Sequence, residues 1–398
     1  GWSPEAGGAD GGSPGGVVPG RSPRGFVSYE GRGGAVTEPL SLQIIGSKAL
    51  GGAERWFARF ARALAETGAR AELAIRAGGG LEELDLGPLP LHSLPLRTVW
   101  DPFSRYAISR LIARVQPDIV QTYMGRATRL THLKPPSRPG QGPVHVARLG
   151  GYYALHPYRH AQAWIGNTRG LCDWMVQQGL PAGRDHHIYN FVEPAQPVAA
   201  ERLASLRAEL GLPAEAWVLV SAGRFVPVKG LTHLIDALAR LPRTIADRPV
   251  RLVLLGEGPL GPALRRQAEA SGIGDRIHWA GWQREPGPYF QMADLVVFPS
   301  LEEETLGNVI LEAWTWSKPL VTSLFRGARE IARHGEDAWC LPCGDARALA
   351  EVIAIMLGDD PLRQDLARGG QARVRAEFAR DPIMARYRDL YRQLVGAA

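Results

Sequence analysis

The feature that most constrains the fold is a repeated alternation of short apolar runs, loops and amphipathic helices, which occurs in both halves of the chain. In the first half, the apolar run 40–45 is followed by a loop of small residues and by a helical pattern over 54–67. In the second half, the run 216–222 leads through residues 223–230 into a helical pattern over 231–240. Such alternation is typical of parallel sheets that helices cover on both faces. The sequence therefore predicts two Rossmann-like α/β domains.

Proline and glycine divide the 398-residue chain into parts. The first segment is mostly Gly, Pro and Ser, which cannot bury enough apolar surface to offset the entropy of an ordered chain. Pro194 and Pro197 interrupt the alternation near the middle and are typical of a linker. We therefore expect a disordered segment over 1–38, a first domain over 39–195, a second domain over 196–375, and a C-terminal helix over 376–398 that packs back on the first domain.

The net charge of +6 is uneven, because residues 41–160 hold twice as many Lys and Arg as Asp and Glu. A basic half can contact nucleic acid, an anionic membrane face or an anionic acceptor. No signature of a nucleic-acid-binding fold accompanies the charge, so we expect no nucleic acid partner. Residues 100–115 are predicted to form a helix with arginines among aromatic side chains. This helix either lies on a membrane surface or is an ordinary amphipathic core helix.

The expected compartment is inferred from membrane-spanning segments, secretion signals and cysteines. No apolar run approaches the roughly 20 residues that span a bilayer, and no secretion signal is visible. The three cysteines, Cys172, Cys340 and Cys343, suit a reducing compartment. The last two form a CxxC, but no nearby pair completes the four ligands of a structural zinc, although His334 is close. We expect no bound metal, and a cytoplasmic protein that is either free or peripheral on the inner face of the cytoplasmic membrane.

The stretch 299–313 carries the strongest chemical signal. It follows the apolar run 293–298, and the Gly-Asn pair at 307–308 opens a helical pattern. A strand end, a loop and a helix N-terminus attract anions, because the first-turn N–H groups are unpaired and the helix dipole favours negative charge. Glu304 and Glu312, eight residues apart, are expected to face one side, where ionised carboxylates accept hydrogen bonds from hydroxyl groups. Together these features suit a sugar attached to a diphosphate, and two solvated surface acids are the alternative.

Other candidates lie in loops that follow strands of the second half. Arg224 and Lys229 come after the run 216–222, at the edge where doubly wound folds bind ligands, and two cations there can neutralise a diphosphate. Ordinary surface charges are the alternative. A GxGxxG motif at 256–261 would suggest a dinucleotide, but it is interior to the second domain and no acid ends the following strand. Trp282 either flanks a nucleobase or is part of the core.

Taken together, these motifs resemble the retaining GT-B glycosyltransferases of family 4, also called glycosyltransferase group 1. The resemblance covers about residues 40–395, and segments 124–129 and 148–193 look most like bacterial members that build lipopolysaccharide core. The matching motifs are Arg224 with Lys229-Gly230, Gly256-Glu257-Gly258-Pro259, Glu304 with Glu312-Ala313, and Lys318-Pro319, preceded in the first half by Gly51-Gly52-Ala53-Glu54-Arg55 and Asn190-Phe191-Val192-Glu193.

The resemblance implies a GT-B fold, in which two Rossmann-like domains face each other across a cleft. The domain over 39–195 would bind the acceptor and the domain over 196–375 the nucleotide sugar. The implied reaction moves a hexose from a nucleotide-diphosphate sugar to a cell-envelope glycan, either free or lipid-linked, with lipopolysaccharide core or a related polysaccharide as product. The family is generally metal-independent, so no cofactor beyond the donor is implied. Retention would follow a front-face route in which the leaving phosphate helps deprotonate the acceptor.

The resemblance also assigns roles to residues. Arg224 and Lys229 would bind the donor diphosphate, and Glu304 would hold hydroxyl groups of the sugar. These three are the candidate catalytic residues, and no protein nucleophile is implied. Glu312 would bind the ribose. The candidate donor-binding residues are Gly52, Gly256, Gly258, Trp282, Leu306, Gly307, Asn308 and Glu312.

Three positions depart from the family pattern. The family often has a His just past the strand that here ends at 148–151, and His156 lies several residues later. Leu306 stands where an aromatic residue is usual, and Trp316-Ser317 replaces a small Cys-Gly pair. The missing His concerns a contact to the donor sugar, and the other two changes concern the shape of the pocket.

Two other functions compete with the transferase. A non-catalytic GT-B binding protein or scaffold would bind nucleotide and release none in the presence of an acceptor. An NAD-dependent oxidoreductase would bind nicotinamide through the glycine motif at 256–261. The intact set of Arg224, Lys229, Glu304 and Glu312 favours the transferase.

Overall fold

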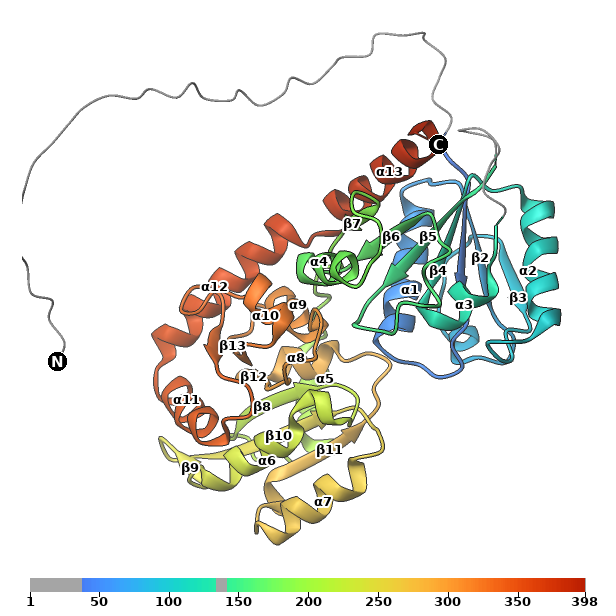
Figure 1. Ribbon diagram of the computed structural model, residues 1–398. Helices are drawn as coiled ribbons and strands as arrows, with labels where there is room; N and C mark the ends of the chain where they lie inside the picture. Colours follow the sequence, from blue (N-terminus) through green and yellow to red (C-terminus); the bar gives the residue numbers. More distant parts are fainter. Residues whose placement is uncertain (1–37, 134–141, 398) are drawn as a thin grey trace, which may run out of the picture. The chain divides into compact units, whose positions relative to one another are not determined.

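Two β-sheets organise the residues that this computed structural model describes, 38–133 and 142–397 (Figure 1). The first sheet has the strand order β3-β2-β1-β4-β5-β6-β7 and the second the order β11-β10-β8-β12-β13-β14. All of these neighbours pair in parallel, whereas β9 runs antiparallel to β10. The strands are β1 (Ser41–Ile45), β2 (Ala71–Arg76), β3 (Leu91–Leu94), β4 (Ile119–Tyr123), β5 (Val144–Leu149), β6 (Ala163–Gly166) and β7 (Asp185–His187), then β8 (Trp217–Ala222), β9 (Thr244–Ile245), β10 (Arg248–Leu255), β11 (Ile277–Gly281), β12 (Leu295–Phe298), β13 (Leu320–Ser323) and β14 (Trp339–Leu341).

This strand order confirms the prediction of two Rossmann-like α/β folds. Each sheet starts at a central strand, β1 or β8, extends to one side, and then continues on the other side. The carboxyl ends of β1 and β4, and of β8 and β12, therefore flank a switch point, which is where doubly wound sheets bind ligands. The expectation for 1–38 lies, apart from Glu38, outside the described residues, and the domain boundaries at 195 and 375 stay predictions.

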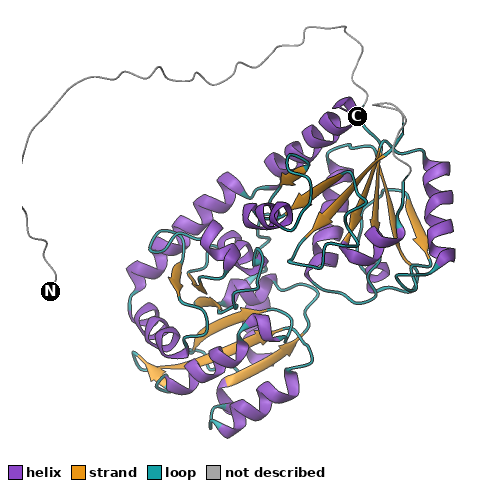
Figure 2. Cartoon of the chain, viewed as in Figure 1, coloured by secondary structure: helices purple, strands orange, loops and turns teal. Residues whose placement is uncertain are grey.

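Helices cover both faces of each sheet (Figure 2). The central strands β1, β4 and β12 are buried along their whole length. β12 is apolar throughout, as is typical of a strand covered on both faces, whereas β1 and β4 each also bury polar residues. The helices are α1 (Gly52–Glu66), α2 (Pro102–Val115), α3 (Met124–Leu130), α4 (Arg169–Gln177), α5 (Ala200–Glu209), α6 (Leu231–Arg240), α7 (Gly261–Ala270), α8 (Gly287–Met292), α9 (Asn308–Thr315), α10 (Arg326–Ile331), α11 (Ala346–Gly358), α12 (Asp360–Glu377) and α13 (Arg380–Ala397). Within the described part of the chain, none of them is long and apolar enough to cross a membrane.

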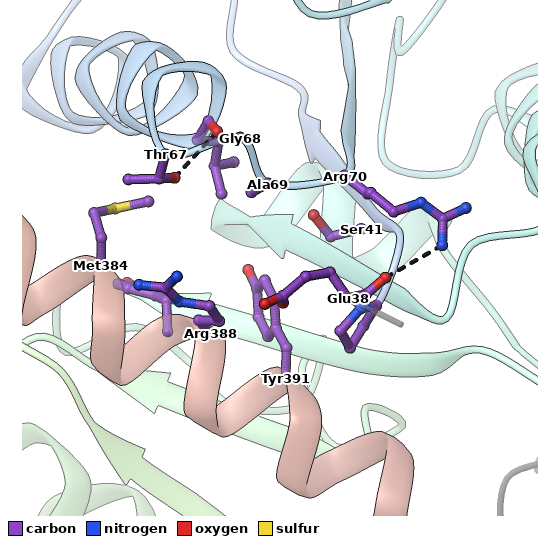
Figure 3. A pocket seen from close by; sticks show the side chains of 12 residues that line it. Glu38, Ser41, Thr67, Gly68, Ala69, Arg70, Met384, Arg388 and Tyr391 are labelled. Atoms are coloured by element: carbon purple, nitrogen blue, oxygen red, sulfur yellow. Dashed lines mark hydrogen bonds between the residues drawn. The ribbon is translucent and has the colours of Figure 1, made fainter. Parts of the chain in front are cut away.

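The last helix, α13, packs against α1 and the first sheet. The rings of Tyr387 on α13 and Phe60 on α1 are 4.6 Å apart, and both side chains are buried. A pocket of about 50 Å³ lies beside α13. Figure 3 shows that Thr67 and Ser41 help to line it. Because Ser41 begins β1, this pocket lies at the opposite end of the strand from the switch-point loops and does not belong to the candidate site.

Candidate active site

The loops after β8 and β12 are joined through their backbones. The N–H of Leu301 donates to the carbonyl of Val228 at 2.7 Å. Gly230 has φ +62°, and a Cβ at this residue would lie 2.0 Å from the carbonyl oxygen of Pro299. Only glycine combines this backbone conformation with so close an approach. The two loops therefore hold each other at the switch point of the second sheet.

An ion pair connects these two loops. The ammonium of Lys229 lies 2.5 Å from Oε2 of Glu304, and both side chains are mostly buried. The stem of Lys229 passes Gly223, and its ammonium lies 5.2 Å from the ring centroid of Phe298. Ser300 donates its hydroxyl to the same carboxylate at 3.4 Å. The structure thus brings two of the three candidate catalytic residues into direct contact.

The third candidate, Arg224, is exposed in the loop after β8 and has no ion pair with any described residue. The next residue holds this loop in place, since the N–H of Phe225 donates to the carbonyl of Glu257 at 2.8 Å. The guanidinium of Arg224 is therefore free to meet an anion beside Lys229. Five N–H donors in a planar fork suit the oxygens of a phosphate.

Gly256 and Gly258 serve the packing of these loops. A Cβ at Gly256, where φ is +124°, would lie 2.0 Å from the carbonyl oxygen of Gly223. A Cβ at Gly258 would lie 2.5 Å from the carbonyl oxygen of Phe225. This backbone contact supplies a physical reason for the glycine motif that requires no dinucleotide, and it fixes the loop that carries Arg224.

Gly307 ends the loop after β12 and precedes the first turn of α9. Its φ is +74°, and a Cβ there would lie within 2.8 Å of the rings of Phe298 and Phe325. The side chain of Leu306 is buried in the core, so its backbone is the part that can approach a ligand. Because α9 begins at Asn308, Glu304 lies in the loop before the helix, as the sequence pattern predicted.

The second acid, Glu312, lies on α9 opposite α1. Its Oε1 is 3.8 Å from Nη2 of Arg59, and each of the two side chains is 19% exposed. Burial raises the pKa of Glu312, and the positive charges of Arg59, Arg55 and Lys229 oppose that increase. Burial also lowers the pKa of Arg59. These charges form one cluster that the two halves of the chain build together.

Trp282 lies at the margin of this cluster and is 38% exposed. The guanidinium of Arg55 is 5.1 Å from its ring centroid and donates to the carbonyl of Gln283. The sequence motif at 51–55 contains Arg55 but indicated no role for it, and the apolar stripe of α1 gave no signal for Arg59. Their spacing of four residues, which places both on one helix face, is the signal that could have found them.

Asn308 connects the second half to the first. Its Oδ1 accepts from Nδ2 of Asn190 at 2.7 Å, and its Nδ2 lies 3.9 Å from the Cβ position of Gly52. Asn190 also accepts from the guanidinium of Arg148, at the end of β5. Gly52 thus lies near the first turn of α9, and Asn190 and Arg148 extend the site into the first sheet, whereas the contact of Gly52 with the donor stays a prediction.

The described residues contain no group of three or more His, Cys, Asp or Glu that could hold a metal ion. The cysteines are free, and Cys172 and Cys340 are buried. Burial raises the pKa of each of these two thiols to about 12, so neither is a reactive thiolate at neutral pH. Metal independence stays a prediction.

Comparison with known proteins places this architecture in a family. Residues 204–373 match the family model "Glycosyl transferases group 1", and residues 50–196 match "Glycosyltransferase Family 4". The lipopolysaccharide core biosynthesis glycosyltransferase LpsE of Rhizobium meliloti (strain 1021) is 32% identical over 353 residues, which are 87% of this chain and 96% of LpsE. LpsD of the same organism is 31% identical over 349 residues, 86% of this chain and 95% of LpsD. The chain belongs to the family 4, or group 1, glycosyltransferases.

Solved structures show the same GT-B fold. Anabaena HepE in complex with UDP-glucose superposes with a TM-score of 0.75 at 21% identity, over 88% of this chain and 99% of HepE. WaaG, a glycosyltransferase involved in lipopolysaccharide biosynthesis, superposes with a TM-score of 0.66 at 18% identity, over 88% of this chain and 99% of WaaG. The chain therefore has the GT-B fold with two Rossmann-like domains, as its sequence predicted.

Proposed function

We propose that this glycosyltransferase transfers a hexose, with retention of anomeric configuration, from a nucleotide-diphosphate sugar to a glycan of the lipopolysaccharide core or a related polysaccharide. The observation that carries the proposal is the Lys229–Glu304 ion pair at the switch point of the second sheet, with Lys229 in the same loop as the exposed Arg224, which forms no ion pair within the described part of the chain. Two relatives named for lipopolysaccharide core biosynthesis and the UDP-glucose complex of HepE support it.

The ion pair defines how the donor would bind. The diphosphate takes the ammonium of Lys229 and the guanidinium of Arg224, and this releases the carboxylate of Glu304 to accept hydrogen bonds from sugar hydroxyls. As the bond from the anomeric carbon to the phosphate oxygen breaks, both cations stabilise the charge that develops on the leaving diphosphate. The acceptor oxygen bonds to the same face of that carbon, and its proton passes to the leaving phosphate. Glu312, held by Arg59, accepts from the ribose.

Helix α2 supports a membrane-bound acceptor. Its inner face buries Ile108 and Leu111, whereas Phe103 and Tyr106 are 73% and 65% exposed. Trp100, just before α2, is 73% exposed. Four exposed arginines lie near these aromatic residues in the sequence: Arg97, Arg105, Arg110 and Arg114. Exposed aromatic side chains surrounded by arginines suit an anionic lipid surface. We propose that this face of α2 contacts the membrane that carries a lipid-linked acceptor.

A vesicle sedimentation assay tests the membrane contact. Vesicles with 30% phosphatidylglycerol should retain the protein, and pure phosphatidylcholine vesicles should retain much less. The double variant Trp100→Ala, Phe103→Ala should bind the anionic vesicles about tenfold more weakly, because two interfacial rings are lost. Equal binding by the variant, or no binding by the wild-type protein, would remove the membrane contact from the proposal.

Thermal shift with UDP, GDP, ADP, their sugar conjugates and NAD tests the donor class. A bound ligand raises the melting temperature by mass action. One nucleoside diphosphate should raise it, and Arg224→Ala should lose that shift, while Arg243→Ala, which removes an exposed ion pair with Asp275, should keep it. A shift with NAD alone would favour the oxidoreductase. Nucleotide binding without release in the presence of acceptors would favour a non-catalytic protein.

A further inference from the structure

Arg148 is a buried cation whose partners are all uncharged. It ends β5, is 5% exposed, and forms no ion pair with any residue in 38–133 or 142–397. Its Nε donates to the hydroxyl of Tyr387 at 3.0 Å, and its Nη2 donates to Oδ1 of Asn190. The ring of Trp56 lies 4.7 Å from the guanidinium carbon. A charge taken out of water is costly unless an opposite charge compensates it.

The third guanidinium nitrogen of Arg148 makes no hydrogen bond within the described chain and faces Gly150. Nη1 lies 3.9 Å from the Cβ position of Gly150, and this glycine is exposed. The amide nitrogen of Asn167, just after β6, lies 3.9 Å from the same point. Asn167 is 4% exposed, its Oδ1 is buried without a hydrogen-bond partner, and its Nδ2 donates to no described residue. Two N–H donors without partners therefore converge on one accessible point.

This point belongs to the side of the first sheet that faces the donor loops. Asn190, which holds Nη2 of Arg148, donates to Asn308 at the start of α9. Burial raises the pKa of Tyr153, in the loop after Gly150; the positive charge of Arg148 opposes that increase, and the charges of Glu54 and Glu304 add smaller increases. The charges of Arg148 and Glu304 therefore both act on the Tyr153 hydroxyl.

We propose that Arg148 and Asn167 form a binding site for an anionic sugar substituent, a carboxylate or a phosphate, on the glycan acceptor or on the donor sugar. This inference rests on the proposed glycosyl transfer and adds an acidic sugar to it. A guanidinium edge and an amide N–H can each donate to a different oxygen of the anion, which fixes the orientation of the sugar. Arg148 is here a substrate-binding residue and takes no part in bond cleavage.

Isothermal titration with matched acidic and neutral sugars tests the site. For the acceptor, the protein saturated with the nucleoside diphosphate found by thermal shift is titrated with D-galacturonate against D-galactose, and with glucose 6-phosphate against glucose. For the donor, UDP-galacturonate is titrated against UDP-galactose. In at least one pair the acidic member should bind about tenfold more tightly, as a charge-assisted contact predicts. The pair that shows the preference identifies which substrate carries the anion.

The variants separate binding from structure. Arg148→Gln should abolish the preference for the acidic sugar. Arg276→Gln should keep it, because Arg276 is an equally buried arginine that donates only to main-chain carbonyls of the second half. If Arg148→Gln does not fold, Gly150→Ala replaces it. The new methyl group makes ordinary 3.9 Å contacts in an unstrained backbone and partly fills the space of the anion.

Equal affinities for the acidic and neutral members of every pair would overturn the proposed anion site. A preference for the acidic sugar that survives in Arg148→Gln would overturn it too. Where Arg148→Gln fails to fold, a preference that survives in Gly150→Ala has the same consequence. In each of these cases the thermal shift with a nucleoside diphosphate would still stand, and only the anion site would fail. Absence of any nucleotide shift would instead remove the proposed function on which the site rests.

Discussion

At the scale of single residues, the site consists of opposite charges that neutralise each other when no ligand is bound. Lys229 neutralises Glu304 at 2.5 Å, and Arg59 lies 3.8 Å from Glu312. A diphosphate competes for the cation of the first pair, and hydroxyl groups compete for its carboxylate. The pair therefore keeps both charges compensated in a partly dry site and still permits exchange, because opening it in the presence of a donor leaves neither group without a hydrogen-bond partner.

The first prediction concerns Lys229. Lys229→Ala should lower kcat by about 100-fold or more, because the charge that develops on the leaving diphosphate loses its nearest cation. Steady-state release of nucleoside diphosphate in the presence of acceptor measures this. Lys318→Ala is the matched control, since that ammonium donates to the carbonyl of Gln291 away from Glu304. Wild-type turnover by Lys229→Ala would show that another group carries the charge.

The second prediction concerns Glu312. Glu312→Ala should weaken nucleotide binding by about tenfold, because a carboxylate that accepts from a ribose hydroxyl is lost and Arg59 loses its counter-charge. Titration calorimetry with the nucleoside diphosphate measures this. Glu209→Ala, which removes an exposed pair with Arg202, should leave the affinity unchanged. An unaltered affinity in Glu312→Ala would remove its assignment to the ribose.

The sequence identified the residues that one local segment brings together and missed those that depend on long-range contacts. Glu304, Gly307 and Asn308 lie in one stretch between a strand and a helix, so a local pattern revealed them. Arg55 and Arg59 meet the second half of the chain more than 200 residues further on. No local periodicity contains such a contact, and the same reason hid the link from Arg148 through Asn190 to Asn308.

At the scale of elements, glycines that let backbones touch hold the loops of the second sheet in place. Gly230 brings the end of the β8 loop against Pro299, and Gly256 brings the β10 loop against Gly223. The sequence showed that glycines lie after strands, and it predicted the extent of α6 correctly. It could not show whether the glycines face a ligand or a neighbouring loop, because that distinction depends on which strands are adjacent.

The third prediction compares two glycines with the same backbone conformation. Gly230 and Gly211 both have φ +62°, but a Cβ meets Pro299 at 2.0 Å in the first case and nothing within 4 Å in the second. Gly211→Ala should cost about 1 kcal/mol of unfolding free energy, from the left-handed backbone alone. Gly230→Ala should cost at least about 2 kcal/mol more and should also weaken nucleotide binding. Urea denaturation measures both, and equal costs would contradict the close contact of the loops.

The fourth prediction concerns the attachment of α13. Gln43, Tyr391, Gln121 and Tyr123 form a closed ring of buried hydrogen bonds, in which each side chain both donates and accepts. Tyr391→Phe removes two of the four bonds and should cost about 2–4 kcal/mol of unfolding free energy, since buried amide groups lose their partners. Tyr106→Phe, at an exposed tyrosine, should cost almost nothing. A negligible loss in Tyr391→Phe would show that the ring does not stabilise the docked helix.

At the scale of the whole molecule, a second set of contacts joins the two halves at α4 and α10. Glu330 on α10 accepts from the first N–H groups of α4, at Arg169 (2.8 Å) and Gly170 (3.1 Å), and from the hydroxyl of Tyr189 at 2.7 Å. His187 lies 3.7 Å from the same carboxylate. The negative charge of Glu330 thus lies at the N-terminus of α4, across the junction, where the helix dipole favours an anion.

The fifth prediction is a pH dependence of this junction. Burial lowers the pKa of His187 to about 4, although Glu330 opposes the shift. The folded state therefore disfavours the charged ring, and stability that is complete above pH 6.5 is lost as the pH falls towards 4. Between pH 7 and pH 5 this residue should account for about 2 kcal/mol of the fall in unfolding free energy. His187→Phe should reduce the fall by that amount in urea denaturation. An undiminished fall would assign it to other groups.

The measurement that tests the central claim most directly is the transfer reaction, followed by nuclear magnetic resonance. The enzyme is incubated with an α-linked nucleotide sugar, identified by thermal shift, and a truncated lipopolysaccharide core oligosaccharide as acceptor. We predict that nucleoside diphosphate appears only when the acceptor is present, and that the anomeric coupling constant of the product is that of an α-linkage. A β-linked product would contradict retention. Nucleotide binding without any transfer to core acceptors would contradict the proposed acceptor class.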